Sequence, residues 1–371
     1  MMSSFRLLRL VCFFALLVFA VSAKAEIQES RAIFDDTFSW VTPAGAEKTL
    51  TRIKSAGFNV YIPCVWIGKG TVWPSTLAPI APEWKSRYVS GYDPLVYLIR
   101  RAHEMGIEVH PWFAVMTRWR DFFPEYYDEG TPEHAFNVHV PEFRKFIVDL
   151  MLEVVRNYDV DGINLDVIRS RGMCTSKHCA IDYKKKFNRD LLTDVAENNA
   201  TPQRLRDKTG TWQYLKDWNR LAVSDIVSSF STRARAIKPT LLISVDSIVL
   251  IEDFRLQGAD SIEWSNNGWI DIIYNMDYKR ELDVRLAENG RSRLKKPDNL
   301  VVLVGNVESL NTTYAYPRDP RLVADLLAFA RTKWAGGNGV AMWTYQFLTD
   351  AQIESIRNGP FKEPAKPFWK K

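Results

Sequence analysis

The stretch DGINLDVIR, residues 161–169, combines a short apolar strand with two polar side chains in its second half. Because side chains alternate along a strand, Asn164 and Asp166 share one face, while Ile163 and Leu165 share the other. We expect the apolar pair to face packed helices and the polar pair to face the opposite side. A carboxylate at the end of a buried strand is costly unless it is paired or used, so Asp166 is the first functional candidate.

Similar strand-like runs recur along the chain and alternate with helical patterns. They lie at residues 33–36, 59–66, 107–115, 162–167, 241–247, 271–278, 300–306 and 339–345. Eight alternating units over roughly 320 residues predict an α/β fold, a single-domain (β/α)8 TIM barrel. A doubly wound open sheet is the alternative. No G-x-G-x-x-G or Walker sequence follows a strand, which disfavours the nucleotide-binding forms of that alternative.

The connection after the fourth strand, from about Arg169 to Gly210, is unusually long. It carries a helical pattern over residues 181–199, and long excursions of this kind often form lids or cleft walls. Cys174 and Cys179 lie in the same segment and could close a small disulfide loop in an oxidising compartment, although their spacing leaves this open. The cluster offers too few ligands for zinc, and we expect no metal and no cofactor.

The N-terminus has the features of a secretory signal peptide. Two arginines in the first ten residues precede an apolar run, and the small residues Ala23 and Ala25 then form a cleavage site. We predict a signal peptide over 1–25, the barrel domain over 26–359 and a C-terminal tail over 360–371. The apolar run is short for a transmembrane helix, so we expect a secreted or periplasmic protein without stable membrane insertion; an uncleaved anchor is the alternative.

The charge of the chain argues against a nucleic-acid partner. The net charge is +5, and residues 1–25 contribute three positive and no negative charges, which leaves +2 after cleavage. No basic stripe with interleaved aromatics is present. The 13 tryptophans suit either sugar-stacking surfaces or a large core. The sequence leaves the oligomeric state open.

In a (β/α)8 barrel the active site lies at the C-terminal ends of the strands. The side chains there include carboxylates, among them Asp35 and Asp36 on the first strand, and many aromatic rings. Converging carboxylates suit glycoside hydrolysis, and aromatic rings offer flat faces to sugars. The catalytic candidates are Asp166, Asp246, Asp277 and Glu308. The candidates for binding an oligo- or polysaccharide substrate are Asn164, Arg169, His110, Trp112, Trp66, Tyr278, Trp343 and Tyr345.

Several of these positions have a second interpretation. Asp246 also suits a salt bridge or a helix N-cap, and His110 also suits a buried core position. On the sixth strand, Tyr274 and Tyr278 could face inward in place of Asp277, because they have the opposite parity.

Two charged residues flank the fourth strand. Asp161 precedes it in a D-G turn at the stable end of the barrel, which indicates a structural role. Arg169 lies three residues past Asp166, where it could pair with that carboxylate and hold it ionised.

The motifs together resemble a known family. DGINLDVIR is similar to the DGIHxDYIRYP signature of the bacterial glycosyl hydrolase-like family ten, and GFNVYIPCVWIGKGTVWPS, GWIDIIYNMDY and GGNGVAMWTY resemble other blocks in the same order. The resemblance spans about residues 31–350. It implies a secreted or envelope TIM barrel that cleaves glycosidic bonds in polysaccharides. It also makes Asp166 the carboxylate and Arg169 the arginine of the signature.

The chain departs from this pattern at four positions. Val167 replaces the usual aromatic residue, and Ser170 and Arg171 replace the usual Tyr-Pro pair. These changes alter the expected shape of the substrate subsites. Asp277 occupies a position where the family commonly has asparagine, which either adds an acid or exchanges one polar group for another.

The sequence therefore favours a glycoside hydrolase that acts on a polysaccharide or cell-envelope glycan. A non-catalytic glycan-binding barrel is the main alternative, since the same aromatic cleft could hold a sugar chain without cutting it. A metal-dependent amidohydrolase is disfavoured, because no H-x-H motif lies on an early strand and the five histidines are scattered.

Overall fold

The computed structural model describes residues 27–85, 91–309, 314–332 and 338–370. The predicted signal peptide lies outside these residues. Among the helices in the described ranges, none combines the length and the apolar character needed to cross a membrane.

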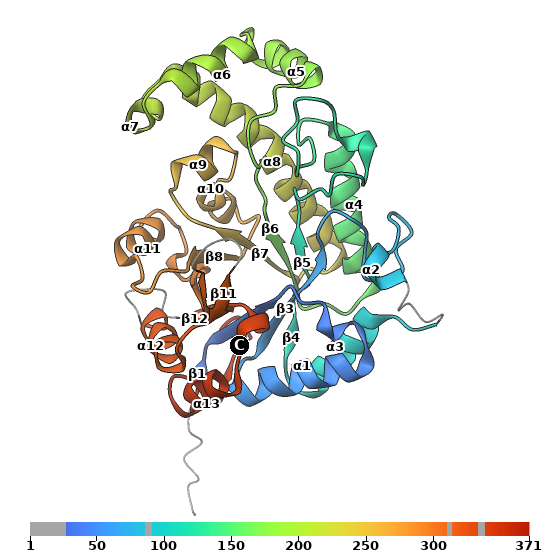
Figure 1. The fold of residues 1–371 in the computed structure, drawn as a ribbon, viewed down its shortest axis with the longest axis vertical. Coiled ribbons are helices and arrows are strands. Elements are labelled where there is room, and N and C mark those ends of the chain that lie inside the picture. Colours follow the sequence, from blue (N-terminus) through green and yellow to red (C-terminus); the bar gives the residue numbers. More distant parts are fainter. Residues whose placement is uncertain (1–26, 86–90, 310–313, 333–337, 371) are drawn as a thin grey trace, which may run out of the picture.

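Eight strand positions form a closed parallel barrel surrounded by helices (Figure 1), which confirms the predicted (β/α)8 fold. The third position is divided between β4 (Glu108–Val109) and β5 (Trp112–Ala114), which both pair with β3. β2 closes the barrel by pairing with both β3 and β12. The other barrel strands are β2 (Ser30–Asp35), β3 (Val60–Trp66), β6 (Gly162–Asp166), β7 (Leu242–Ser247), β8 (Ile272–Asp277), β9 (Leu300–Gly305) and β12 (Gly339–Trp343).

The helices alternate with these strands and begin at local capping signals. α1, for example, follows Thr42, whose hydroxyl accepts the N–H of Gly45, and ends at Gly57 with φ 89°. The α-helices are α1 (Pro43–Ala56), α2 (Pro82–Lys85), α3 (Pro94–Glu104), α4 (Pro141–Asn157), α5 (Lys177–Phe187), α6 (Leu191–Ala200), α7 (Gln203–Arg206), α8 (Gly210–Ile237), α9 (Glu252–Leu256), α10 (Ser261–Asn266), α11 (Val284–Arg291), α12 (Pro320–Ala330) and α13 (Asp350–Asn358). The short elements are β1 (Ile27–Gln28), β10 (Val307–Ser309), β11 (Ala315–Pro317), β13 (Ala365–Lys366), η1 (Ser39–Val41), η2 (Pro124–Tyr126), η3 (Pro297–Asn299) and η4 (Tyr345–Phe347).

Alternate residues of each strand supply two separate apolar cores. The barrel interior is filled by side chains such as Phe34, Trp112 and Tyr274, whose rings meet edge to face at centroid distances of 5.6 and 5.4 Å. The outward set, with Ile163 and Leu165 among it, packs against the helices. This parity turns the polar residues of β6 into the barrel, as the sequence predicts.

The connection from β6 to β7 forms an excursion of four helices, of which α5, α6 and α7 lie beyond the barrel (Figure 1). The sequence pattern predicts one helix over residues 181–199, and this expectation is wrong. The structure has α5 and α6 there instead. Asn188 adopts a left-handed conformation with φ 55° at the end of α5, and Asp190 then caps α6 through the N–H of Thr193.

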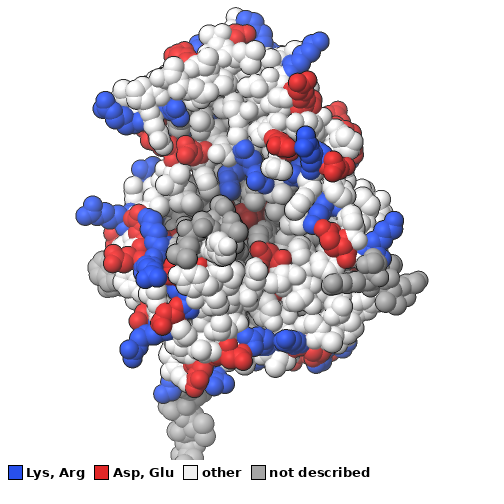
Figure 2. All heavy atoms as spheres, viewed as in Figure 1, with Lys and Arg blue, Asp and Glu red and all other residues white. Residues whose placement is uncertain are grey.

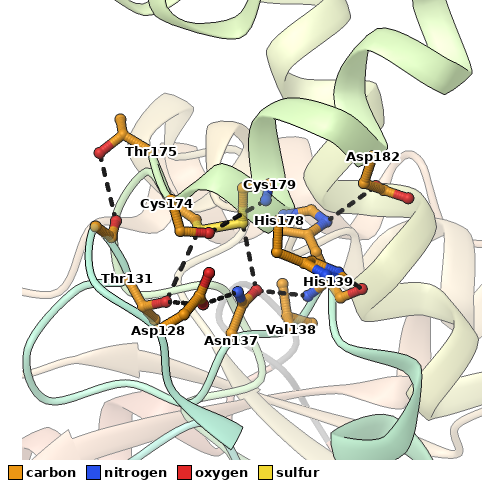
Figure 3. Close-up of a disulfide and its surroundings, with 12 residues drawn as sticks. Asp128, Thr131, Asn137, Val138, His139, Cys174, Thr175, His178, Cys179 and Asp182 are labelled. Carbon is orange, nitrogen blue, oxygen red and sulfur yellow. Dashed lines mark hydrogen bonds and ion pairs between the residues drawn. A yellow bond between two sulfur atoms is a disulfide. The ribbon is translucent and has the colours of Figure 1, made fainter.

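A disulfide between Cys174 and Cys179 fixes the first turn of α5 to the segment after β6 (Figure 3). Next to it, the imidazole of His139 stacks on the indole of Trp218 at 3.5 Å, and His178 on α5 contacts the carbonyl of His139. Burial lowers the pKa of His139 to about 3. The excursion is thus held by a packed joint with an uncharged histidine at its centre.

The C-terminal tail packs across the N-terminal end of the barrel. Strand β13 pairs with β1, and the indole N–H of Trp369 donates to Oε2 of Glu108 at 2.9 Å. Lys370 forms an ion pair with the same carboxylate at 2.6 Å. Because Phe368 and Trp369 also pack against the interior core, the tail closes the bottom of the barrel.

Candidate active site

Asp166 and Asp246 end neighbouring strands at matching positions. In the parallel ladder of β6 and β7, Asn164 lies opposite Ser244 and Leu165 opposite Val245, so the two aspartates form the next pair. Neighbouring strands lie about 4.8 Å apart. Of the second acids expected from the sequence, the structure therefore brings Asp246 beside Asp166.

Asp246 is the more deeply buried member of this pair, with 4% of its surface exposed. One of its carboxyl oxygens accepts the side-chain N–H of Asn164 at 3.0 Å. Burial, followed by the negative charge of Asp166, raises the pKa of Asp246 well above its ordinary value, and the Asn164 bond only partly opposes this. Asp246 thus retains its proton to higher pH.

Asp166 is partly exposed at the mouth of the barrel. One of its oxygens accepts the backbone N–H of Val167 at 2.5 Å, and Val167 has a left-handed backbone with φ 50°. Burial raises the pKa of Asp166, while the positive charge of Arg169 is the largest influence that lowers it. The indole of Trp112 faces the carboxyl group without a well-formed hydrogen bond.

Two arginines follow Asp166 on the same loop. The guanidinium of Arg169 lies 4.1 Å from the ring centroid of Phe254, and Arg171 donates to the hydroxyl of Thr117 at 2.9 Å. Arg169 lies close enough to lower the pKa of Asp166 but forms no direct ion pair with it within the described residues. Figure 2 shows a hollow on the face that is drawn. Asp or Glu side chains lie inside this hollow, and Lys and Arg side chains lie along one of its margins.

Aromatic and acidic groups complete the rim. The rings of Tyr278 and Trp343 lie 5.2 Å apart at the ends of β8 and β12. Burial, with the nearby charges of Asp246 and Asp166, raises the pKa of Tyr278 well above its ordinary value. Asp36 follows β2, which is opposite β6 and β7 in the strand order, and it accepts the hydroxyl of Thr344 at 3.2 Å.

Asp277 does not face the mouth, which corrects the expectation for β8. Its carboxylate accepts the backbone N–H groups of Asp283 and Lys279 and so fixes the loop before α11. The interior face of β8 is occupied by Tyr274 and Met276, so the opposite parity holds on this strand.

Glu308 also has a structural role and lies outside the group of catalytic candidates at the mouth. It lies on the β10–β11 hairpin, where its Oε1 atom accepts the guanidinium groups of Arg318 at 2.8 Å and Arg280 at 3.0 Å. Arg318 is buried and also binds the carbonyls of Gly305 and Tyr278, so this cluster holds the ends of β8 and β9 together.

Trp66 and Tyr345 lie outside the mouth. The pairing of β3 shifts between Cys64 and Trp66, and the irregularity turns the indole outward into a fully buried contact with Phe123 and Phe146. Tyr345, in η4, packs against the outer core. Neither ring offers an open face to a sugar at the barrel mouth.

His110 lies at the bottom of the barrel, away from the predicted site. It is fully buried, bonds Glu108 at 3.1 Å and has its ring centroid 5.9 Å from that of Trp369. Gly162 gives it space, because a Cβ atom there would lie 2.8 Å from Nδ1 of His110. At the same end of β6, Asp161 binds His103 at 2.7 Å, in line with the expected structural role.

Residues 32–122 and 115–308 match the family model of glycosyl hydrolase-like 10. The chain belongs to this family. Among curated relatives of the glycosyl hydrolase-like 10 chain, glycosyl hydrolase YngK of Bacillus subtilis (strain 168) is 24% identical over 52% of this chain and 37% of its own length. Glycosyl hydrolase DigH of Escherichia coli (strain K12) is 22% identical over 51% of this chain and 44% of its own length. The matches thus cover less than half of either relative.

Solved structures with the same fold include two carbohydrate-active enzymes. The glycoside hydrolase domain of PgaB (BpsB) from Bordetella bronchiseptica has a TM-score of 0.58 and 11% identity, over 88% of this chain and 95% of that one. The catalytic domain of β-amylase from Paenibacillus polymyxa has a TM-score of 0.59 and 9% identity, over 92% of this chain and all of that one. At such low identity these likenesses establish the fold.

The catalytic and binding candidates predicted from the sequence omit two residues of this site, Asp36 and Arg171. Asp36 is named there only as a strand-end carboxylate, although it follows the inward-facing Phe34 by two positions, so strand parity favours it as a candidate. Arg171 stands where the family signature has proline, and that departure was its only sequence signal.

Proposed function

We propose that the protein is a glycoside hydrolase, secreted or periplasmic, that cleaves glycosidic bonds in a polysaccharide or cell-envelope glycan. The observation that carries this proposal is the pair of inward carboxyl groups, Asp166 and Asp246, at the C-terminal ends of β6 and β7. Family membership supports the class of reaction.

Asp166 is the group that acts on the glycan, because it is the more accessible member of the pair. With its pKa raised by burial, it serves as the general acid that protonates the leaving glycosidic oxygen. Asp246 stays protonated beside it, because burial and the charge of an ionised Asp166 raise its pKa. Asp36, on the opposite wall of the mouth, is the carboxylate placed to act as nucleophile or to activate water.

Tyr278 and Trp343 provide the sugar-binding surface in this proposal. Their paired rings stand at the same end of the barrel as Asp166, and Tyr278 is close enough to the two aspartates for their charges to raise its pKa. A sugar ring stacked there would keep its edge hydroxyls free for the polar groups of the mouth.

The test is release of reducing ends from a panel of polysaccharides by the wild type and by Asp166→Asn, Asp246→Asn and Asp36→Asn. Asp325→Asn is the matched control, because this aspartate is exposed on α12. We expect Asp166→Asn to reduce the rate by about 10²–10⁴-fold, the usual range for loss of a general acid, and Asp325→Asn to match the wild type.

Equal product release by the wild type and a folded Asp166→Asn variant would refute the assignment of Asp166. Tight binding of a glycan by the wild type without any product after long incubation would instead identify a non-catalytic glycan-binding barrel. Circular dichroism of each variant establishes that the fold is kept.

A further inference from the structure

Arg169 and Arg171 present two guanidinium groups at the mouth without an ion-pair partner among the described residues. Other arginines near strand ends are committed to the scaffold: Arg118 donates to the carbonyls of Arg120 and Phe122, and Arg318 binds Glu308. The two mouth arginines thus have donor groups that the described part of the chain leaves unused.

The two side chains are held in place by contacts that leave their donors available. Phe254 covers one face of the Arg169 guanidinium, and a stacked guanidinium keeps its N–H groups free in its own plane. Arg171 has five N–H donors and uses one of them in the hydrogen bond to Thr117. Both groups are therefore oriented before any ligand arrives, which lowers the entropic cost of binding.

Positive charge exceeds negative charge on this wall of the mouth, which favours binding of an anion. Asp246 is buried beside Asp166 and retains its proton, so two positive groups face a single ionisable carboxylate, Asp166. When Asp166 carries the proton that a general acid needs, both guanidinium groups are without a negative counterpart on the β6 loop.

We propose that Arg169 and Arg171 bind a carboxylate carried by the glycan, so that the preferred substrate is an acidic polysaccharide. This inference rests on the proposed function, since it assigns the substrate class of the same site. A planar guanidinium binds a planar carboxylate through two parallel N–H···O bonds, which gives both strength and orientation. Of the two arginines, Arg171 is the residue that departs from the family signature, and we assign to it the preference for a carboxylate.

The binding test compares acidic polysaccharides with their own neutral forms. Polygalacturonate, alginate and hyaluronate are each paired with the carboxyl-reduced polymer, and affinity is measured by calorimetry on Asp166→Asn protein so that cleavage cannot interfere. We expect the affinity for at least one acidic polymer to be at least roughly tenfold higher than that for its reduced form. This is the usual contribution of one charge-assisted hydrogen bond.

Arginine variants then locate this preference. Arg171→Gln and Arg169→Gln are expected to weaken binding of the acidic polymer by about 10- to 100-fold and of the reduced polymer by less than about threefold. Arg171→Lys keeps the charge but loses the planar fork, so it should recover only part of the affinity. Arg321→Gln, an exposed arginine on α12, is the matched control and should change nothing.

Equal affinity for acidic and reduced polymers, or no binding of any acidic polymer, would overturn the inference. An equal loss for both forms in Arg171→Gln would do the same. A preference for dextran sulfate over dextran without any preference for carboxylates would also overturn it and assign the arginines to sulfate.

Product release is read separately from binding. Cleavage without a carboxylate preference contradicts this inference alone, whereas a carboxylate preference without cleavage supports it and contradicts the proposed hydrolysis.

Discussion

Asp166 and Asp246 stand side by side at the ends of β6 and β7, and the negative charge of Asp166 disfavours ionisation of Asp246. Two like charges at this separation are costly to hold together in a buried site, so the pair binds a proton more tightly than isolated carboxyl groups do. The protonation of this pair connects the structure with both activity and stability.

Asp246→Asn is expected to keep the pH dependence of hydrolysis. Burial is the largest cause of the raised pKa of Asp166, and Asp246 still holds its own proton when Asp166 ionises, so an uncharged asparagine replaces an uncharged acid. With Asp166 as the general acid, the alkaline limb of the kcat/KM profile should therefore stay at the wild-type pH. A limb that moves to lower pH in the variant would show that a negative charge on Asp246 raises the pKa of Asp166.

The same substitution is expected to stabilise the protein at neutral pH. Folding raises the pKa of Asp246 above its ordinary value of 3.8, so its contribution to stability is fully present below about pH 3.8 and is lost as the pH rises through the folded-state pKa. An asparagine keeps an oxygen that can accept the Asn164 bond and has no charge to bury. The melting temperature of Asp246→Asn should exceed that of the wild type at pH 7–8 by roughly 2–4 °C.

Thermal unfolding between about pH 3.5 and pH 8 measures this difference, with Asp325→Asn as the control. The difference in melting temperature between Asp246→Asn and the wild type should become small toward the acidic end of the range. A difference that is constant with pH would mean that the charge on Asp246 is not its cause.

Trp343 and Trp66 should behave differently although both end barrel strands. Trp343→Ala removes one ring of the tilted pair at the mouth and should raise KM for the glycan by about 2- to 10-fold, since a ring contact contributes roughly 0.5–1.5 kcal/mol. Trp66→Phe shrinks a side chain in the outer core and should lower stability by about 1–3 kcal/mol without changing KM. Steady-state kinetics and urea unfolding distinguish them, and a raised KM in Trp66→Phe would place that ring at the substrate.

Trp369→Phe tests the closure of the barrel bottom. The change keeps an aromatic ring but deletes the N–H that donates to Glu108, whose carboxylate is almost fully buried. Loss of a hydrogen bond to a buried charge should lower the free energy of unfolding by about 1–3 kcal/mol. Urea unfolding measures it, and Trp119→Phe, at an exposed indole, is the control. Unchanged stability would show that the tail contact is not retained in solution.

Local patterns were sufficient for the fold and for the orientation of β6. The alternation of strands and helices predicted the barrel, and period-two alternation predicted that Asn164 and Asp166 face inward. These features depend on neighbouring residues in the chain, whose spacing fixes which face each side chain takes. The cysteine pair was also visible in the sequence, but only the structure shows it joined.

Tertiary structure alone decided which groups meet. The register of β6 and β7 selected Asp246 as the partner of Asp166, and the filled interior of β8 turned Asp277 away. A shift in β3 pairing rotated Trp66 outward, and the tail covered the end of the barrel that contains His110. Each outcome depends on contacts between segments far apart in the chain, whereas a sequence pattern reports only the preferences of one segment at a time.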